Sequence, residues 1–284
     1  MRRWARSRTH CGKCGASMNE PNGIRGTFSK QRLAGMKRLL QKKYREEEGL
    51  FIVEGWKSLA EAVGAGIRFR TLLIVEGAAD DAALLERLIR NADESFAVSE
   101  KELADVTDAV TPQGIAAVMP MFDPEAALRS MAPEQGIIVA ADSVNDPGNL
   151  GTIIRTADWF GAAGVVIGEG SAEPYNPKTV RATMGSLFHL PVAHGVPLPA
   201  FLRRRRQEGW SIITTEVNGS ELLGTVVPPE RSVLVIGSES HGVSEEISSL
   251  ADLRVAIPKF GTAESLNAAM ACGIILSHFT MRRS

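Results

Sequence analysis

The most constraining feature of the sequence is a short apolar run followed at once by a polar turn and an amphipathic segment. Residues Ile137–Ala141 are apolar, residues 142–149 (DSVNDPGN) are rich in Asn, Asp, Gly and Pro, and apolar residues then recur at helical spacing up to Phe160. This pattern predicts a buried strand, a turn and a helix, with the turn at the carboxyl end of a parallel sheet. Arg155 is a permanent cation on this otherwise apolar helix, so we treat it as a candidate functional residue.

Two further turns of similar composition each follow an apolar run. The first is GSESHG at 237–242, and the second is PKFGTAESLN at 258–267, which runs into the last predicted helix. Three permissive turns at one edge of a sheet predict a single ligand crevice, because glycines there let backbone groups approach a ligand closely. The phosphate-loop pattern GxxxxGK[ST] is absent, and no GxGxxG fingerprint follows the first strand.

Strands alternating with helices fall into two sets, which predict two α/β domains. We expect a flexible basic extension over 1–27, a small α/β sandwich over 28–120, a linker over 121–133, and an open parallel sheet with helices on both faces over 134–284. A single basic helix is expected from Lys30 to about Glu47. In the second domain we expect strands at 137–141, 164–167, 190–192, 211–215, 233–236 and 253–257, and helices at 150–161, 177–183, 198–208, 244–250 and 265–280.

The charge distribution is asymmetric, although the net charge is only −1. Residues 1–48 hold 13 Lys/Arg and 4 Asp/Glu, whereas the remaining 236 residues hold 19 and 29. A basic arm on a mildly acidic body indicates a polyanionic partner met by one end of the chain, and a solvated tail is the alternative that composition leaves open. Three cysteines are too few for a disulfide framework, which favours a reducing compartment, and no apolar run reaches the length of a membrane span.

Other site chemistries find little support in the sequence. His10, Cys11 and Cys14 form an HCxxC pattern, but no second CxxC follows, so we interpret the two cysteines as plain thiols rather than as a zinc site. The remaining histidines lack metal-ligand spacing, and we expect no metal. GSESHG does not match the GxSxG nucleophile elbow, so hydrolysis through Ser238 is not favoured.

The three turns together resemble the three ordered motifs of the SpoU/TrmH family of S-adenosylmethionine-dependent RNA ribose 2′-O-methyltransferases. The matching residues are DPGNLGTIIRTA at 146–157, GSESHG at 237–242, and IP at 257–258 with SLN at 265–267. FIVEG at 51–55 is similar to the start of that family's substrate-binding module, which resembles a small RNA-binding ribosomal protein. The resemblance covers roughly residues 30–281. It departs at 268–271, where AAMA stands in place of the common VSVA, a change of packing more than of chemistry.

The resemblance implies a parallel sheet that ends in a carboxyl-terminal trefoil knot, S-adenosylmethionine as cofactor, and a homodimer that needs neither a metal nor a membrane. It implies catalytic roles for Arg155, Asn149, Glu239, Ser265 and Asn267, and cofactor contacts from Thr215, Gly237, Ile257 and Leu266. The basic helix supplies the candidate RNA-binding residues Lys37, Arg38, Lys42, Lys43 and Arg45. A second basic run, Arg203–Arg206, we interpret as a solvated helix end.

The resemblance implies an enzyme that methylates a ribose 2′-hydroxyl of RNA, with large-subunit ribosomal RNA as the favoured target, and we expect it to be cytoplasmic. Transfer RNA, a non-catalytic knotted ribosome-assembly factor and a nucleotide-binding oxidoreductase remain as alternatives. A side-chain pKa above ~12 makes Arg155 a poor base, so we expect it to bind the neighbouring phosphate and stabilise the developing alkoxide. Structural pairing of Arg155 with Glu239 is the competing interpretation.

Overall fold

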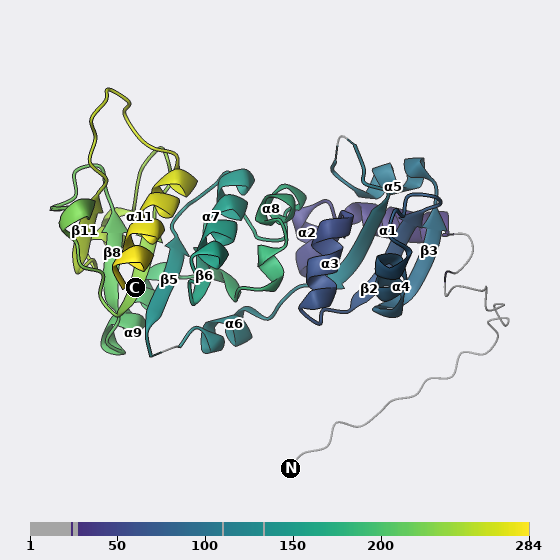
Figure 1. Cartoon of the computed structure of the whole chain (residues 1–284), viewed down its shortest axis with the longest axis horizontal. Helices are drawn as coiled ribbons and strands as arrows, with labels where there is room; N and C mark the ends of the chain where they lie inside the picture. The colour runs from purple at the N-terminus through teal and green to yellow at the C-terminus, as the bar shows by residue number, and fades with distance from the viewer. Residues whose placement is uncertain (1–23, 25–27, 110, 133, 284) are drawn as a thin grey trace, which may run out of the picture.

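A computed structural model describes residues 24, 28–109, 111–132 and 134–283. Nearly all of the predicted extension over 1–27, with Cys11 and Cys14, therefore lies outside the described residues. Two sheets follow one another along the long axis of the molecule, the first built from residues 50–120 and the second from residues 136–256 (Figure 1). No helix within the described ranges is long and apolar enough to cross a membrane.

The first sheet has four strands in the order β1-β4-β2-β3, with β2 and β3 parallel and the other pairs antiparallel. Alternate residues of its strands pack into separate apolar cores on the two faces, which produces a small sandwich. The strands are β1 (Leu50–Glu54), β2 (Phe69–Val75), β3 (Ala92–Val98) and β4 (Ile115–Pro120). The helices are α1 (Lys30–Arg38), α2 (Lys42–Glu48), α3 (Trp56–Gly64), α4 (Ala82–Arg90) and α5 (Glu100–Val106).

The second sheet has seven strands in the order β7-β6-β5-β10-β8-β11-β9, and its neighbouring strands run parallel. The chain builds β5, β6 and β7 toward one edge and then crosses to the other side of β5, so the strand order reverses beside β5. In such sheets ligands bind outside the carboxyl ends of the strands at the reversal point. The strands are β5 (Gly136–Ala141), β6 (Gly164–Gly168), β7 (Val192–Val196), β8 (Ser211–Thr215), β9 (Glu221–Leu222), β10 (Arg231–Ile236) and β11 (Leu253–Ala256).

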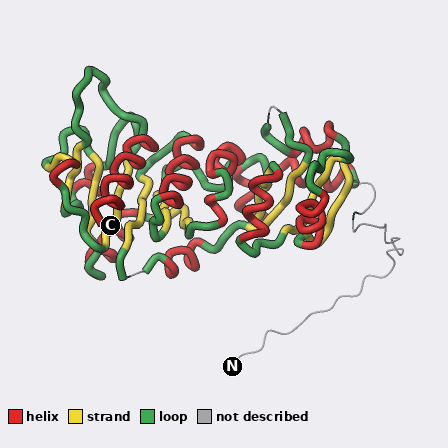
Figure 2. The backbone as a smooth tube through the Cα atoms, viewed as in Figure 1, coloured by secondary structure: helices red, strands yellow, loops and turns green. Residues whose placement is uncertain are grey.

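Helices cover both faces of this parallel sheet, as the continuous apolar runs of its central strands require. On one face Ile137 and Val139 pack with α7 (Pro147–Trp159) and α11 (Ala268–Arg283), while on the other Ile138 and Ala140 pack with α9 (Leu198–Gln207) and α10 (Glu245–Ser248). Helices α7 and α11 lie side by side, followed by α8 (Pro177–Thr183) nearer the first domain (Figures 1 and 2). The α/β class and the mainly parallel sheet agree with the prediction.

The single basic helix predicted from Lys30 to Glu47 is wrong, because the chain turns between α1 and α2. Leu39 ends α1 with its side chain buried, and Gln41 begins α2 in an extended conformation. The guanidinium Nη1 of Arg45 donates to the carbonyl oxygen of Leu39 at 2.7 Å. The Leu39 carbonyl oxygen, which the end of α1 would otherwise leave unpaired, therefore accepts a hydrogen bond from the side chain of Arg45.

Other departures from the predicted elements are local. The predicted linker contains a helix, α6 (Pro124–Ser130), which Asp123 caps by accepting from the backbone N–H of Glu125 at 2.9 Å. The strand predicted at 190–192 lies at β7, beyond Pro191, and the two-residue edge strand β9 was not predicted. Helix α11 starts at Ala268 rather than at 265, because the Asn267 side chain accepts from the backbone N–H groups that follow it.

The two sheets are joined by a packed interface between β1 and α8. Its centre holds the aromatic rings of Phe51, Phe122 and Tyr175, and the Tyr175 hydroxyl accepts from the backbone N–H of Phe122 at 2.9 Å. Beside them Arg45 of α2 forms an ion pair with Glu173, and both side chains are buried. The first domain is therefore anchored to the second through apolar, aromatic and ionic contacts.

Candidate active site

Three loops leave the carboxyl ends of β5, β10 and β11 and meet at one place. Residues 142–146 follow β5, residues 237–244 follow β10, and residues 257–267 follow β11 and lead into α11. Asp142 is buried, and its Oδ2 accepts from the backbone N–H of Ser244 at 2.8 Å, which ties the first loop to the second. The three loops predicted to form one site thus lie together, although the first is more than 90 residues from the other two along the chain.

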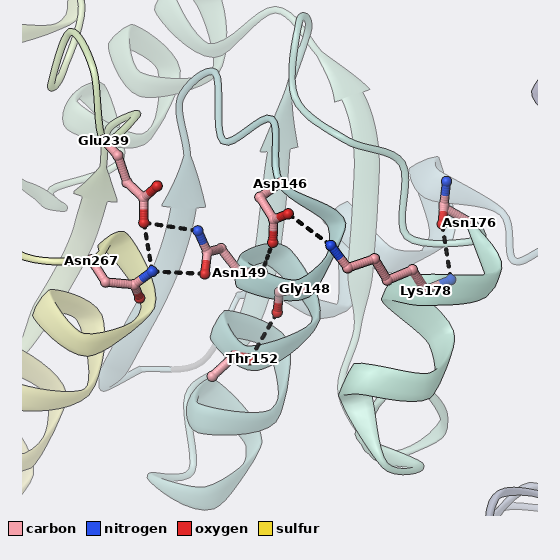
Figure 3. Close-up of polar contacts among 8 residues, drawn as sticks. All are labelled: Asp146, Gly148, Asn149, Thr152, Asn176, Lys178, Glu239 and Asn267. Atoms are coloured by element: carbon pink, nitrogen blue, oxygen red, sulfur yellow. Dashed lines mark hydrogen bonds and ion pairs between the residues drawn. The ribbon is translucent and has the colours of Figure 1, made fainter. Parts of the chain in front are cut away.

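A compact amide–carboxylate cluster occupies this meeting point (Figure 3). Asn149 Nδ2 donates to Glu239 Oε1 at 2.9 Å, and Asn267 Nδ2 reaches the same oxygen at 2.5 Å and Asn149 Oδ1 at 2.9 Å. The backbone N–H of Ala268 also donates to Glu239 Oε1, at 3.3 Å. One carboxylate oxygen thus orients two amides, and each amide comes from a different helix start.

The first turn of α7 is fixed by its own residues. Asp146 is the N-cap, and its Oδ1 accepts from the backbone N–H of Asn149 at 2.8 Å, while Pro147 occupies the first helical position. Gly148 is needed here because a Cβ atom at that position would lie 2.9 Å from Asp146 Oδ1. The cap and the proline together fix the position from which the Asn149 side chain reaches Glu239.

The structure does not bring every predicted catalytic residue into this cluster. Arg155 lies on α7 six residues beyond Asn149, about 9 Å along the helix axis at 1.5 Å per residue. Its side chain is exposed and forms no hydrogen bond or ion pair with any residue that the structure describes, so the proposed structural pairing with Glu239 is not present. Ser265 is also exposed, two residues before Asn267.

The described residues give no support to a serine nucleophile, a metal site or a reactive thiol. Ser238 is a turn residue: its backbone pairs with Gly242, and its hydroxyl accepts from the backbone N–H of His241 at 3.1 Å. Within the described part of the chain, no three His, Cys, Asp or Glu side chains gather where they could hold a metal ion. Cys272 is fully buried in α11, and burial raises the pKa of its thiol to about 12.

Comparison with known proteins shows to which family the chain belongs. The family model described as SpoU rRNA Methylase family matches residues 136–277, and one described as MRM3-like substrate binding domain matches residues 30–117. The 23S rRNA (guanosine(2553)-2′-O)-methyltransferase RlmP of Bacillus subtilis is 33% identical over 248 residues, which is 87% of this chain and 95% of that protein. The chain belongs to the SpoU rRNA methylase family.

Solved structures of this family superpose closely on the chain. The SpoU methyltransferase AviRb from Streptomyces viridochromogenes, in complex with the cofactor AdoMet, gives a TM-score of 0.80 at 30% identity and covers 90% of this chain and 98% of its own. An AdoMet-bound rRNA methyltransferase from Sinorhizobium meliloti gives 0.80 at 33% identity, with 92% and 98% covered. The expectation of a SpoU-family RNA methyltransferase that uses S-adenosylmethionine is confirmed.

The candidate cofactor residues lie at or after the carboxyl ends of β8, β10 and β11, the strands whose loops form or adjoin the amide–carboxylate cluster. A Cβ atom on Gly237 would lie 2.1 to 2.2 Å from the backbone of Gly242 and Val243, so this position requires glycine. Thr215 ends β8 and donates through Oγ1 to the Val235 carbonyl oxygen at 3.2 Å. Ile257 is half-buried and Leu266 is about half exposed. The close approach at Gly237 is between the two ends of its own loop, and Ile257 and Leu266 are apolar side chains of the kind that line adenosine sites.

The candidate RNA-binding residues divide into exposed and buried ones. Lys37, Lys42 and Lys43 are exposed, and each lies within 3.8 Å of a carboxylate at the surface. The Arg38 guanidinium lies 3.9 Å from the centre of the Tyr44 ring. Arg45 was wrongly assigned to this group, because its side chain is 2% exposed and pairs with Glu173 at the domain interface. Burial lowers the pKa of Arg45, and the nearby Glu46 carboxylate opposes that effect.

The run Arg203–Arg206 on α9 is paired throughout with acidic side chains. Arg203 contacts Glu246 at 2.9 Å, Arg204 and Arg205 contact Glu208 at 2.9 Å, and Arg206 contacts Asp252 at 2.8 Å. Arg203, Arg204 and Arg206 are exposed, as expected of a solvated helix end, but Arg205 is buried, so the interpretation is wrong for Arg205.

Sequence reasoning missed one side chain beside the site. Lys178 is the second residue of α8, and its Nζ lies 2.9 Å from Asp146 Oδ2 (Figure 3). The signal available in the sequence was the Asn176-Pro177 pair, a helix start that places the next residues in the first turn. Nothing in the sequence pairs that turn with Asp146.

Proposed function

We propose that this chain transfers a methyl group from S-adenosylmethionine to a ribose 2′-hydroxyl of large-subunit ribosomal RNA. The observation that carries the proposal is the Asn149–Glu239–Asn267 cluster, which joins the three motif loops of a SpoU-family chain at one point. The relative RlmP is named for 2′-O-methylation of a guanosine in 23S rRNA, and that substrate class comes to this chain as part of the proposal.

The proposed roles follow from charge and geometry. S-adenosylmethionine, when bound, supplies a sulfonium-activated methyl group. Glu239 holds the Asn149 and Asn267 amides in fixed orientations, so they can position the ribose hydroxyl without rearranging. Arg155, exposed and unpaired among the described residues, binds the phosphate beside the target ribose and stabilises the developing alkoxide. Ser265 completes the wall of the site.

The cofactor would lie along the loops after β8, β10 and β11. We assign Thr215, Gly237, Ile257 and Leu266 to it. The position of these residues at or after the carboxyl ends of β8, β10 and β11 supports this assignment.

The first domain, residues 28–120 in our division, would hold the RNA. The exposed cations Lys37, Arg38, Lys42 and Lys43 lie on α1 and α2 and would contact phosphates. The interface between the domains fixes their distance from the cluster, which suits a folded RNA target reached from two sides. Residues 121–133 connect this domain to the methyltransferase domain at 134–284.

A trefoil knot in the second domain is part of the proposal. Strand β11 lies three places from β5 in the sheet, yet α11 packs against α7, the helix that follows β5. Residues 257–267 must therefore cross back past the ends of β8 and β10, where Asn267 meets the loop that carries Glu239. An experimental structure in which 257–267 did not thread through the neighbouring loops would contradict the knot.

A homodimer is the second structural part of the proposal. Helices α7 and α11 pack together and leave large apolar side chains exposed, with Trp159 at 84% and Met270 at 60%. Large apolar side chains exposed on two adjacent helices are candidates for a contact with a second copy of the chain. Light scattering on the full chain should give twice the mass of one chain, and a monomer would contradict the dimer. A cytoplasmic location follows from the proposed ribosomal target.

Methylation of total RNA tests the function. RNA from a strain that lacks the gene is incubated with the full chain and tritiated S-adenosylmethionine, and the labelled ribose is mapped. We expect one 2′-O-methyl site in large-subunit ribosomal RNA. Label confined to transfer RNA would replace the substrate, and cofactor binding without label would favour a non-catalytic assembly factor.

A further inference from the structure

Lys178 lies outside the three motif loops but contacts Asp146, the last residue of the first loop and the N-cap of α7 (Figure 3). Its Nζ is 2.9 Å from Asp146 Oδ2, while Asp146 Oδ1 accepts from the backbone N–H of Asn149 at 2.8 Å. The Asn149 side chain then donates to Glu239. One carboxylate therefore links the lysine on α8 to the asparagine of the cluster, with a separate oxygen for each.

The position of Lys178 is fixed by its own helix. Asn176 caps α8 and accepts from the backbone N–H of Lys178 at 2.9 Å. Helix α8 packs very closely on α7 at Gly151, where a Cβ atom would lie 2.5 Å from Ala182 Cβ and 2.6 Å from the Thr179 carbonyl oxygen. Lys178 thus reaches Asp146 from the start of a helix that is packed closely against α7.

The ion pair between Lys178 and Asp146 fixes the orientation of the Asp146 carboxylate but adds little to the folding free energy. The side chains of Lys178 and Asp146 are 55% and 45% exposed, and pairs of that exposure contribute little to folding free energy. The Lys178 ammonium, followed by the Asn149 backbone N–H, lowers the pKa of the Asp146 carboxyl. Each of the two Asp146 oxygens thus has its own partner, Lys178 for Oδ2 and the Asn149 backbone for Oδ1. The ion pair therefore affects the position of Asn149, through the first turn of α7, more than it affects folding stability.

We propose that Lys178 is a positioning residue of the methyl-transfer site, which acts through Asp146 to hold Asn149 against Glu239. The inference rests on the proposed function, because its readout is the transfer step. It assigns Lys178 no contact with the RNA or with the cofactor. Misplacement of a positioning group by about 1 Å can cost up to a hundredfold in rate, so even a weak ion pair can be kinetically important.

The test compares variants of the full chain by steady-state methylation of the mapped RNA. We expect Lys178→Met to lower kcat about tenfold, with the KM for RNA and the Kd for S-adenosylmethionine within about twofold of wild type. Lys178→Arg should restore most of the rate, since it keeps a cation opposite Asp146. Arg203→Met is the matched control: its pair with Glu246 has the same 2.9 Å distance on an element away from the cluster, and its kcat should not change.

A double-mutant cycle with Asp146→Asn separates the routes by which Lys178 could act. Asparagine can still accept from the Asn149 backbone but carries no charge, so Lys178→Met should add no further loss in that background. An unchanged kcat in Lys178→Met would overturn the inference, and so would a raised KM for RNA in both backgrounds, which would indicate direct phosphate contact. Lys178→Gln serves the same cycle if the Met variant does not fold. A wild-type chain without transfer would instead refute the proposed function.

Discussion

Arg155 and Arg45 mark two regions in which the same side chain has opposite surroundings. Arg155 is exposed on α7 beside the candidate active site and has no partner among the described residues. Arg45 is buried where the two domains meet, donates to the Leu39 carbonyl oxygen and pairs with Glu173. An unpaired cation beside a site is free to bind a substrate anion, whereas a buried and paired one serves the fold. We therefore propose that Arg155 acts on the substrate, whereas Arg45 holds the two domains together.

Arg155→Ala is the variant with the largest expected effect, and it tests whether the exposed arginine acts on the substrate. We expect kcat for methyl transfer to fall by about 10³-fold or more, because the phosphate contact and the alkoxide stabilisation are both lost. The Kd for S-adenosylmethionine and the midpoint of thermal unfolding should hardly change, since the side chain is exposed and unpaired in the described structure. Tritiated-methyl transfer, calorimetric titration and a thermal melt measure the three quantities.

Arg155→Lys is the graded companion variant. It keeps a positive charge but loses the planar fork that binds a phosphate through two N–H groups, so we expect an intermediate rate. Turnover of the alanine variant close to that of wild type would refute the assigned role and remove the functional half of the comparison.

Arg45→Met should produce the converse result. Removing one partner of a buried pair leaves the Glu173 charge uncompensated, which typically costs about 3–5 kcal/mol of unfolding free energy. The double variant Arg45→Met with Glu173→Met should recover most of that loss, because an apolar pair of similar volume is often neutral. Urea unfolding measures both, and kcat per folded molecule should stay near the wild-type value.

A matched control is available on the same helix. Lys43→Met removes an exposed cation whose side chain is 72% accessible, and its unfolding free energy should change by less than about 1 kcal/mol. If Arg45→Met proved as mild as this control, the structural role assigned to Arg45 would be wrong.

The two arginines also show which parts of the structure can be predicted from the sequence. Helices and strands can be predicted from local patterns, whereas contacts between distant residues cannot. The strands β5, β8 and β10 and the helix α7 follow from local apolar patterns, because parallel strands buried on both faces are continuous apolar runs. The break after Leu39 does not, because it depends on Arg45 satisfying the freed carbonyl. The burial of Arg45 depends in turn on Glu173, 128 residues further along the chain.

The same reasoning applies to the site. The motif resemblance assigns Asn149, Glu239 and Asn267 to one site, but no local rule places side chains 90 and 118 residues apart within hydrogen-bonding distance. Lys178 escaped prediction for the same reason, since its contact with Asp146 depends on the close packing of α7 against α8 at Gly151. Contacts between elements, rather than the elements themselves, are what sequence patterns leave out.

The smallest expected effect concerns the exposed cations that share α2 with Arg45. Lys42 and Lys43 each lie near a glutamate four residues on, at 3.6 and 3.8 Å, and both pairs are largely solvated. The variant Lys42→Ala/Lys43→Ala should weaken RNA binding by about three- to tenfold at low salt, with unfolding free energy and kcat nearly unchanged.

A salt series decides whether these two lysines contact phosphates. Loss of two phosphate contacts should reduce the slope of log K against log[salt] by about 1.4 to 1.8, depending on whether the contacted RNA is single- or double-stranded. An affinity and a slope equal to those of wild type would mean that the glutamates neutralise both lysines, and that the RNA lies against another face of the first domain. In that case α2 would serve the fold, through Arg45, and would not contact the RNA.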